Sequence, residues 1–146
     1  MCIRDSTTLG ARGVRYEIDF YGRMTTAIER GEESDRCLVR WDLRSPRVEA
    51  AARGEVAALD LDAARAAGAP VLISVADDGS PVTGDPAGDG PALVQVHPDI
   101  EQLRIDAPDT AGDWRRAVRD TLGQTMQSGH HLTAAARDGW YLVEPA

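Results

Sequence analysis

The sequence predicts a single domain of the α+β class. Several segments alternate apolar with polar residues at a period of two, which is typical of strands with one buried face. Other segments are rich in alanine or repeat apolar residues every three to four positions, as helices do. A length of 146 residues suits one domain with one hydrophobic core.

The chain is expected to begin with a leader that is not part of the domain. Met1–Ser6 resemble the translated adaptor found on reading frames assembled from environmental DNA. Residues 1–12 are therefore expected to be unstructured, and the domain to span residues 13–146. This reading also makes the chain a candidate for the C-terminal part of a longer protein.

Two strands and a short helix are expected next. Alternation over 14–20 and again over 37–43 predicts the strands, and Met24–Arg30 predicts a short helix between them. Cys37 and Trp41 fall on the apolar side of the second strand, so both are expected in or near the core.

A helical region and a buried strand follow. Ser45 and Pro46 suit the cap and first position of an alanine-rich helix. Gly54 is expected to divide this region, and Asp60 or Asp62 to cap a second piece that ends before Pro70. The continuous apolar run 71–76 predicts a buried strand.

The C-terminal half is expected to contain a loop, a bent strand, a long helix and a hairpin. The loop spans 77–90, the strand runs from Leu93 to Pro108 with a bend at Pro98, and the helix over 109–128 is capped by Asp109 or Asp113. Its apolar stripe contains Trp114, Val118, Leu122 and Met126 and is expected to pack against the strand at 71–75. A turn at Arg137–Gly139 predicts the final hairpin, in which Trp140 is expected to be buried.

From Cys37 onward the order is strand, helix, strand, strand, helix, strand. This βαββαβ order resembles the split βαβ pattern of ferredoxin-like folds. The N-terminal strand and the C-terminal hairpin are then expected as additions at the sheet edges. Such a fold would not by itself imply a function.

Charge and composition narrow the choice of partners. The net charge is -8 and the pI about 4.8, so no nucleic acid is expected as a partner. Arg115, Arg116 and Arg119 form one dense basic group, but Asp113 and Asp120 lie on the same predicted helix, which favours a solvated helix face. The sequence has no apolar run long enough to span a bilayer and no signal-peptide pattern, so no membrane contact and a cytoplasmic location are expected.

The residue inventory excludes several enzyme classes. The sequence contains no lysine and no asparagine. Without lysine there is no P-loop, no Schiff base and no protein-kinase lysine. The CxxC pairs and HExxH motif of zinc sites are also absent, as are a GxGxxG loop and a nucleophile elbow.

One polar cluster remains as a candidate site. On an extended segment, alternation would aim His97, Asp99 and Glu101 at one face, where an imidazole and two carboxylates could bind a divalent metal. His130, or its neighbour His131, could complete the site. The alternative interpretation is a strand end, a His-Pro-Asp turn and a solvated glutamate, which requires no cofactor.

The sequence therefore supports two hypotheses for function. The first is a noncatalytic binding, regulatory or oligomerisation domain whose partner is a protein, either a second copy or a longer parent chain. It rests on a complete fold pattern without a catalytic motif. The second is a small metal-dependent hydrolase that uses His97, Asp99, Glu101 and His130.

Overall fold

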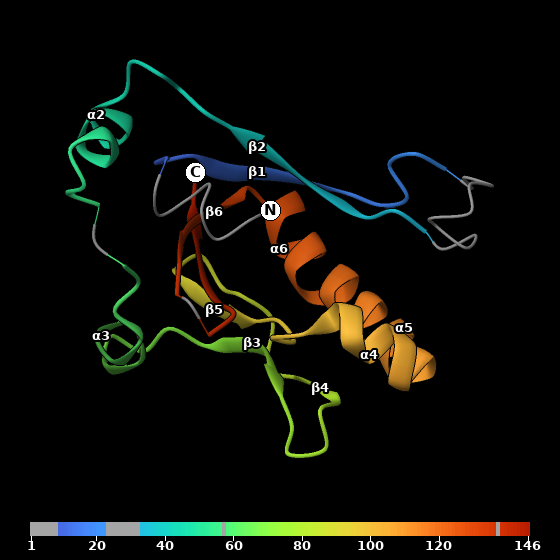
Figure 1. Ribbon diagram of the computed structural model, residues 1–146. Coiled ribbons are helices and arrows are strands. Elements are labelled where there is room, and N and C mark those ends of the chain that lie inside the picture. The colour runs from blue at the N-terminus through green and yellow to red at the C-terminus, as the bar shows by residue number, and fades with distance from the viewer. Residues whose placement is uncertain (1–8, 23–32, 57, 137) are drawn as a thin grey trace.

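The described residues form one seven-stranded sheet with helices on both of its faces (Figure 1). The computed structural model describes residues 9–22, 33–56, 58–136 and 138–146. Within them, no helix combines the length and apolar character needed to cross a bilayer. The elements are, in chain order, β1 (Arg12–Glu17), β2 (Arg36–Arg40), α2 (Pro46–Ala52), α3 (Leu61–Ala66), β3 (Val71–Val75), β4 (Pro81–Thr83), β5 (Ala92–Gln95), α4 (Ile100–Asp106), α5 (Pro108–Val118), η1 (Arg119–Gly123), α6 (Gln124–Gln127), β6 (His130–Ala135) and β7 (Trp140–Pro145).

The order of strands in the sheet is β2-β1-β6-β7-β5-β3-β4. All neighbouring pairs are antiparallel except β3 and β5, which are parallel. The mixed α+β class is confirmed. The ferredoxin-like arrangement is not, because the sheet has seven strands in this order.

The C-terminal hairpin forms the centre of the sheet, so its predicted place at an edge is wrong. Strand β6 pairs with β1, and β7 pairs with β5. The residues of β7 are apolar on both faces, with Trp140, Tyr141 and Val143 all buried. A run of apolar residues without polar residues between them is typical of a strand that is covered on both faces. This pattern in β7 indicated a central strand. The turn itself is as predicted, with Gly139 at a φ of 84°.

At the N-terminus, the fold begins earlier than expected. Ala11 is buried and β1 begins at Arg12, before the predicted boundary at residue 13. Residues 1–8 and the predicted helix Met24–Arg30 lie outside the described residues. Strand β2 ends at Arg40, so Trp41 lies beyond it and is 50% exposed. The prediction that Trp41 is near the core is wrong for that reason, whereas Cys37 packs against the core as expected.

The two short helices have the predicted caps. The side chain of Ser45 accepts a hydrogen bond from Val48 N, and that of Asp60 accepts one from Ala63 N. In each helix this satisfies one of the backbone donors that the first turn leaves free. Helix α3 covers the sheet face opposite α5, where the Arg65 guanidinium stacks on the buried Trp140 ring with 4.9 Å to its centroid.

Residues 77–108 contain two elements that differ from the prediction. Within the expected flexible loop, β4 adds an edge strand that pairs with β3. After Pro98 the chain forms helix α4, not a continued strand, because the Asp99 side chain caps it by accepting from Gln102 N at 3.0 Å. Ile100 and Leu103 are three residues apart and both pack against the core, which is a helical spacing.

The long helix is present and packs as predicted. Trp114, Leu122 and Met126 are buried in one cluster with residues of β3, and Val118 packs against it. The predicted caps Asp109 and Asp113 are wrong, since the helix begins at Pro108 without a side-chain cap. Its middle, η1, is a π-helical turn. The residues of the stripe are four positions apart, so in a regular α-helix each would be rotated about 40° around the helix axis from the one before. The π turn has more residues per turn, and it therefore brings the stripe back toward the core.

Candidate functional site

The structure does not place the predicted metal ligands on one extended face. His97 lies in a turn, where its Nδ1 accepts from Asp99 N at 3.2 Å, and its ring is 6.0 Å from that of Trp114. Asp99 caps α4, and Glu101 forms an ion pair with Arg104 at 3.0 Å within the same helix. The alternation on which the cluster was predicted is therefore absent.

The two other candidate imidazoles lie apart from this turn, on β6. His130 is buried, and its ring nitrogens lie 3.3 Å from Ser128 Oγ and 3.2 Å from Gly90 O. His131 lies next to it on the strand and lines a different hollow. In the part of the chain that the structure describes, no three histidine, cysteine or acidic side chains are grouped so that they could hold a metal ion.

The strongest candidate for a ligand-binding site is a basic pocket on the sheet face opposite α5. It is a hollow of about 530 Å³ lined by Arg12 of β1, Arg40 of β2, Arg47 of α2 and His131 of β6. The acidic side chain among its lining residues is that of Asp42, whose Oδ1 accepts from Arg44 N, and the lining also includes Ala146 with its α-carboxylate. Three guanidinium groups thus border one cavity in a chain with a net charge of -8.

Long-range contacts fix Arg47 in this pocket. Its Nε donates to Gly10 O at 3.1 Å and its guanidinium also donates to Thr133 O. Gly10 has a φ of 71°, and a Cβ there would lie 3.0 Å from Arg47 O. The glycine therefore allows the chain before β1 to approach α2 closely, which holds Arg47 between the helix and the sheet.

The cations of the pocket repel one another. Burial lowers the pKa of Arg47, and the nearby charge of Arg12 lowers it further. Burial also lowers the pKa of His131, with additional contributions from Arg40 and Arg12. Arg12 and Arg40 form no ion pair with any residue that the structure describes. Positive charge is thus held together at this place without full neutralisation, which favours an anion.

Comparisons with known proteins add no assignment. No protein-family model matches the chain, and no curated protein or solved structure matches it. The function must therefore be argued from the geometry of these residues.

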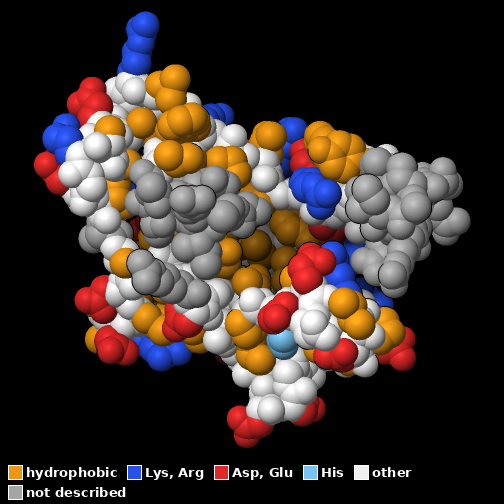
Figure 2. All heavy atoms as spheres, in the orientation of Figure 1, with side chains coloured by type: hydrophobic (Ala, Val, Ile, Leu, Met, Phe, Trp, Pro, Cys, Tyr) orange, Lys and Arg blue, Asp and Glu red, His pale blue; other side chains and the backbone are white. Residues whose placement is uncertain are grey.

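A second cluster of charges lies in a cleft of about 320 Å³ between the β1–β2 ribbon and the helices α4 and α5. Figure 2 shows this face hollowed there, with hydrophobic side chains at the floor. On its wall, both oxygens of Asp35 accept hydrogen bonds from Arg119 at 2.6 Å, and Tyr16 Oη donates to Asp35 Oδ2 at 2.7 Å. Glu33 also pairs with Arg119.

These contacts correct the prediction of a solvated helix face for Arg119, whereas Arg116, Asp113 and Asp120 are exposed as expected. Arg119 is only 18% exposed and Asp35 10%. Burial alone would raise the pKa of Asp35, but hydrogen bonds from Arg119, Tyr16 and the backbone lower it below its usual value. Burial and the bond to Asp35 raise the pKa of Tyr16. Since acids neutralise Arg119 here, the cluster joins the ribbon to the helix rather than attracting an anion.

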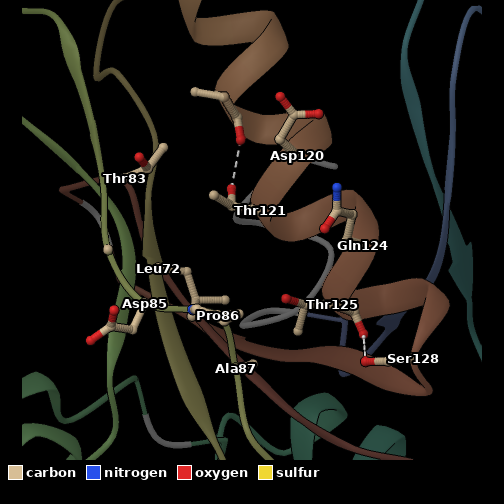
Figure 3. A pocket seen from close by; sticks show the side chains of 12 residues that line it. Leu72, Thr83, Asp85, Pro86, Ala87, Asp120, Thr121, Gln124, Thr125 and Ser128 are labelled. Atoms are coloured by element: carbon tan, nitrogen blue, oxygen red, sulfur yellow. Dashed lines mark hydrogen bonds between the residues drawn. The ribbon is translucent and has the colours of Figure 1, made fainter.

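A third hollow, of about 480 Å³, lies between the long helix and the segment after β4 (Figure 3). Asp85 and Asp120 lie on its two walls. The hydroxyl groups of Thr121 and Ser128 donate to helix carbonyls, those of Ala117 and Thr125. This groove is polar and acidic, and the hydroxyl protons of Thr121 and Ser128 are already used within the helix, so the basic pocket is the stronger candidate.

Sequence reasoning missed the basic pocket. Its arginines come from positions 12, 40 and 47, and only the fold brings them together with His131. A signal was present in β2, where Arg36 and Arg40 alternate with the half-buried Cys37 and Val39. The net charge of the whole chain is negative, and it does not reveal the positive charge on one face of this strand.

Proposed function

We propose that this protein is a noncatalytic binding domain that recognises a small anionic group, of the carboxylate, phosphate or sulfate type, in its basic pocket. The observation that carries the proposal is the convergence of Arg12, Arg40 and Arg47 with His131 around one hollow, whose lining residues include one acidic side chain, that of Asp42. Guanidinium groups present paired donors in a plane that matches the oxygens of such anions.

The energetics of the pocket favour binding. Arg47 is oriented by backbone carbonyls and is partly removed from water, so it loses little freedom when an anion arrives. Like charges held near each other cost free energy in the empty pocket, and an anion between them removes that cost. One oxygen of Asp42 accepts a hydrogen bond from Arg44 N, which orients this carboxylate in the turn before α2.

The test uses sulfate at constant ionic strength. At one hundred times its dissociation constant, a ligand that binds only the folded state stabilises it by about 2.7 kcal/mol. For a domain of this size, this raises the melting temperature by roughly 6 to 10 °C. We expect a saturable rise in the wild type and its loss in an Arg12→Gln, Arg40→Gln double variant, and calorimetric titration should give the same result.

A matched control separates the pocket from general salt effects. Arg116 is exposed on α5 and pairs with Asp113, so Arg116→Gln lowers the charge without touching the pocket. This variant should respond to sulfate as the wild type does. A rise that persists in the double variant, or a wild type that shows no saturable rise, would refute the proposal.

Anion binding should tighten as the pH falls from about 8 to 5.5, a range in which sulfate keeps its charge. Burial and the neighbouring arginines lower the pKa of His131 in the empty pocket. An anion offsets those arginines and raises that pKa, so binding takes up a proton. The charged groups around the imidazole are those of Arg12, Arg40, Arg47, Asp42 and Glu144 and the α-carboxylate of Ala146. His131→Gln should remove most of a three- to tenfold change in affinity, and a flat profile in the wild type would contradict this reasoning.

The alternative function stays a prediction with less support. A metal-dependent hydrolase would need His97, Asp99 and Glu101 to converge, but Asp99 caps a helix and Glu101 pairs with Arg104. These roles explain the same residues through backbone and helix geometry. A binding domain requires no such convergence.

A further inference from the structure

Strand β2 is an open edge of the sheet. Among the described residues it pairs with β1 only, and Figure 1 shows no strand beyond it. An edge strand presents backbone donors and acceptors that an extended segment of another chain can pair with. At five residues, β2 is long enough for such pairing.

One face of this edge is basic. Arg36, Leu38 and Arg40 alternate with half-buried residues, and all three are exposed. Tyr16 faces the long helix, where a Cβ on Gly123 would contact its ring at 3.3 Å, and Tyr16 is the register partner of Cys37. Leu38 and Arg40 therefore lie on the opposite face, where the basic pocket is. Arg36 is at the start of the strand, where its guanidinium lies over the Tyr21 ring at 5.3 Å, donates to Asp35 O and borders the cleft beside α5.

A β-bulge in β1 extends this basic face. The register shifts between Gly13 and Arg15, so that Arg12 lies opposite Arg40 and Arg15 lies opposite Leu38. Arg12 and Arg15 are three positions apart and would face opposite ways in a regular strand. The bulge brings both to the face of Arg40, where Arg15 also pairs with Glu17, the residue opposite Arg36. Arg12 and Arg40 continue into the basic pocket.

A second copy of this chain fits the edge poorly. In the antiparallel register that pairs all five residues of β2 with themselves, Arg36 of one copy would lie opposite Arg40 of the other, twice. Like charges directly opposite each other destabilise a strand pair.

We propose that β2 binds an acidic, extended segment of a partner protein by strand addition. Carboxylates of that segment contact Arg36 and Arg40, an apolar residue between them covers Leu38, and one carboxylate enters the basic pocket. The last contact rests on the function proposed above, whereas the pairing along β2 does not. Strand pairing supplies affinity through the backbone, and alternate side chains supply specificity.

The experiment uses an eight-residue peptide, blocked at both ends, in which a valine lies between two glutamates, two positions from each, and every other residue is threonine. One face of the added strand then presents glutamate, valine and glutamate to Arg36, Leu38 and Arg40. Hydrogen exchange should slow at backbone amides of residues 36–40 when the peptide is added. A control peptide with the same side chains and N-methylated backbone amides cannot form the ladder and should give no protection. Arg36→Glu should weaken peptide binding about three- to tenfold while leaving sulfate binding unchanged, because Arg36 does not line the basic pocket. Arg116→Glu, on the exposed face of α5, should change neither.

The outcomes distinguish the two proposals. Sulfate binding without protection of 36–40, or equal binding of the N-methylated peptide, would overturn strand addition and leave the anion pocket intact. Protection of residues 36–40 without sulfate binding would refute the proposed anion pocket and support strand addition at β2. Dimerisation through β2, seen as protection of 36–40 that depends on protein concentration alone, would also overturn this proposal. So would tighter binding of a single-stranded oligonucleotide than of the peptide.

Discussion

The cluster of Asp35, Arg119 and Tyr16 offers the sharpest test of how the ribbon is held to the helix. Asp35→Asn keeps the shape of the side chain but removes its charge. It weakens two hydrogen bonds from Arg119 at 2.6 Å and one from Tyr16 at 2.7 Å. Removing one partner of a buried ion pair typically costs 3 to 5 kcal/mol. Glu33 still pairs with Arg119 and is half-exposed, so we expect about 3 kcal/mol.

Urea denaturation followed by circular dichroism measures this cost. A loss of about 3 kcal/mol corresponds to roughly 6 to 12 °C in melting temperature for a domain of this size. In a double-mutant cycle with Arg119→Gln, the two costs should fail to add by about 2 kcal/mol, because each variant removes the same contacts.

A control pair lies on the same helix. Arg116 and Asp113 form an ion pair whose side chains are 67% and 55% exposed. Such pairs contribute little, so Asp113→Asn should change stability by less than about 0.5 kcal/mol. If Asp35→Asn costs no more than this control, or if the cycle is additive, the cluster is screened by solvent and does not hold the ribbon.

Three further predictions concern the core, the pH dependence of stability and metal binding. Trp114→Ala should lower the free energy of unfolding by about 3 to 5 kcal/mol in urea denaturation, as large-to-small core changes do. The ring is 2% exposed and its Nε1 donates to Gly79 O at 2.8 Å. A variant as stable as the wild type would contradict this packing. Because the folded pKa of Asp35 lies below its unfolded value, its contribution to stability is complete above about pH 4 and is lost as the pH falls toward the folded pKa. Acid titrations of stability should therefore be less steep in Asp35→Asn than in the wild type. Zinc, manganese and magnesium should leave the melting temperature unchanged, whereas a metal-dependent rise that His97→Ala abolishes would favour the hydrolase.

The features that sequence reasoning predicted well are those that neighbouring residues determine. Ser45 and Asp60 cap helices because a short oxygen-bearing side chain reaches the backbone N–H three positions later. The buried stripe from Trp114 to Met126 follows from helical spacing alone. The final hairpin follows from a glycine at the turn.

The features that were missed depend on which strands become neighbours. The hairpin is central because β1 and β5 pair with its two strands, and no local pattern states that choice. Helix α4 was missed because Leu103 and Ile105 suggested alternation, although Ile105 is 71% exposed.

The candidate site was missed for a related reason. Its arginines are far apart in the sequence, and one of them faces the pocket only because a bulge shifts the register of β1. Alternation predicts the faces of a strand correctly only as far as the first bulge.

The π-helical turn Arg119–Gly123 is a place where the chain should tolerate the deletion of one residue. Such a turn accommodates one residue more than an α-helical turn, so deleting one residue there can restore a regular helix. The segments before and after the deletion would then keep their relative orientation, because the lost residue is the one that the wide turn absorbs. Trp114, Leu122 and Met126 would all stay on the core face of the helix. Related chains that lack the wide turn should therefore have a one-residue gap at this place and the same set of residues in the core.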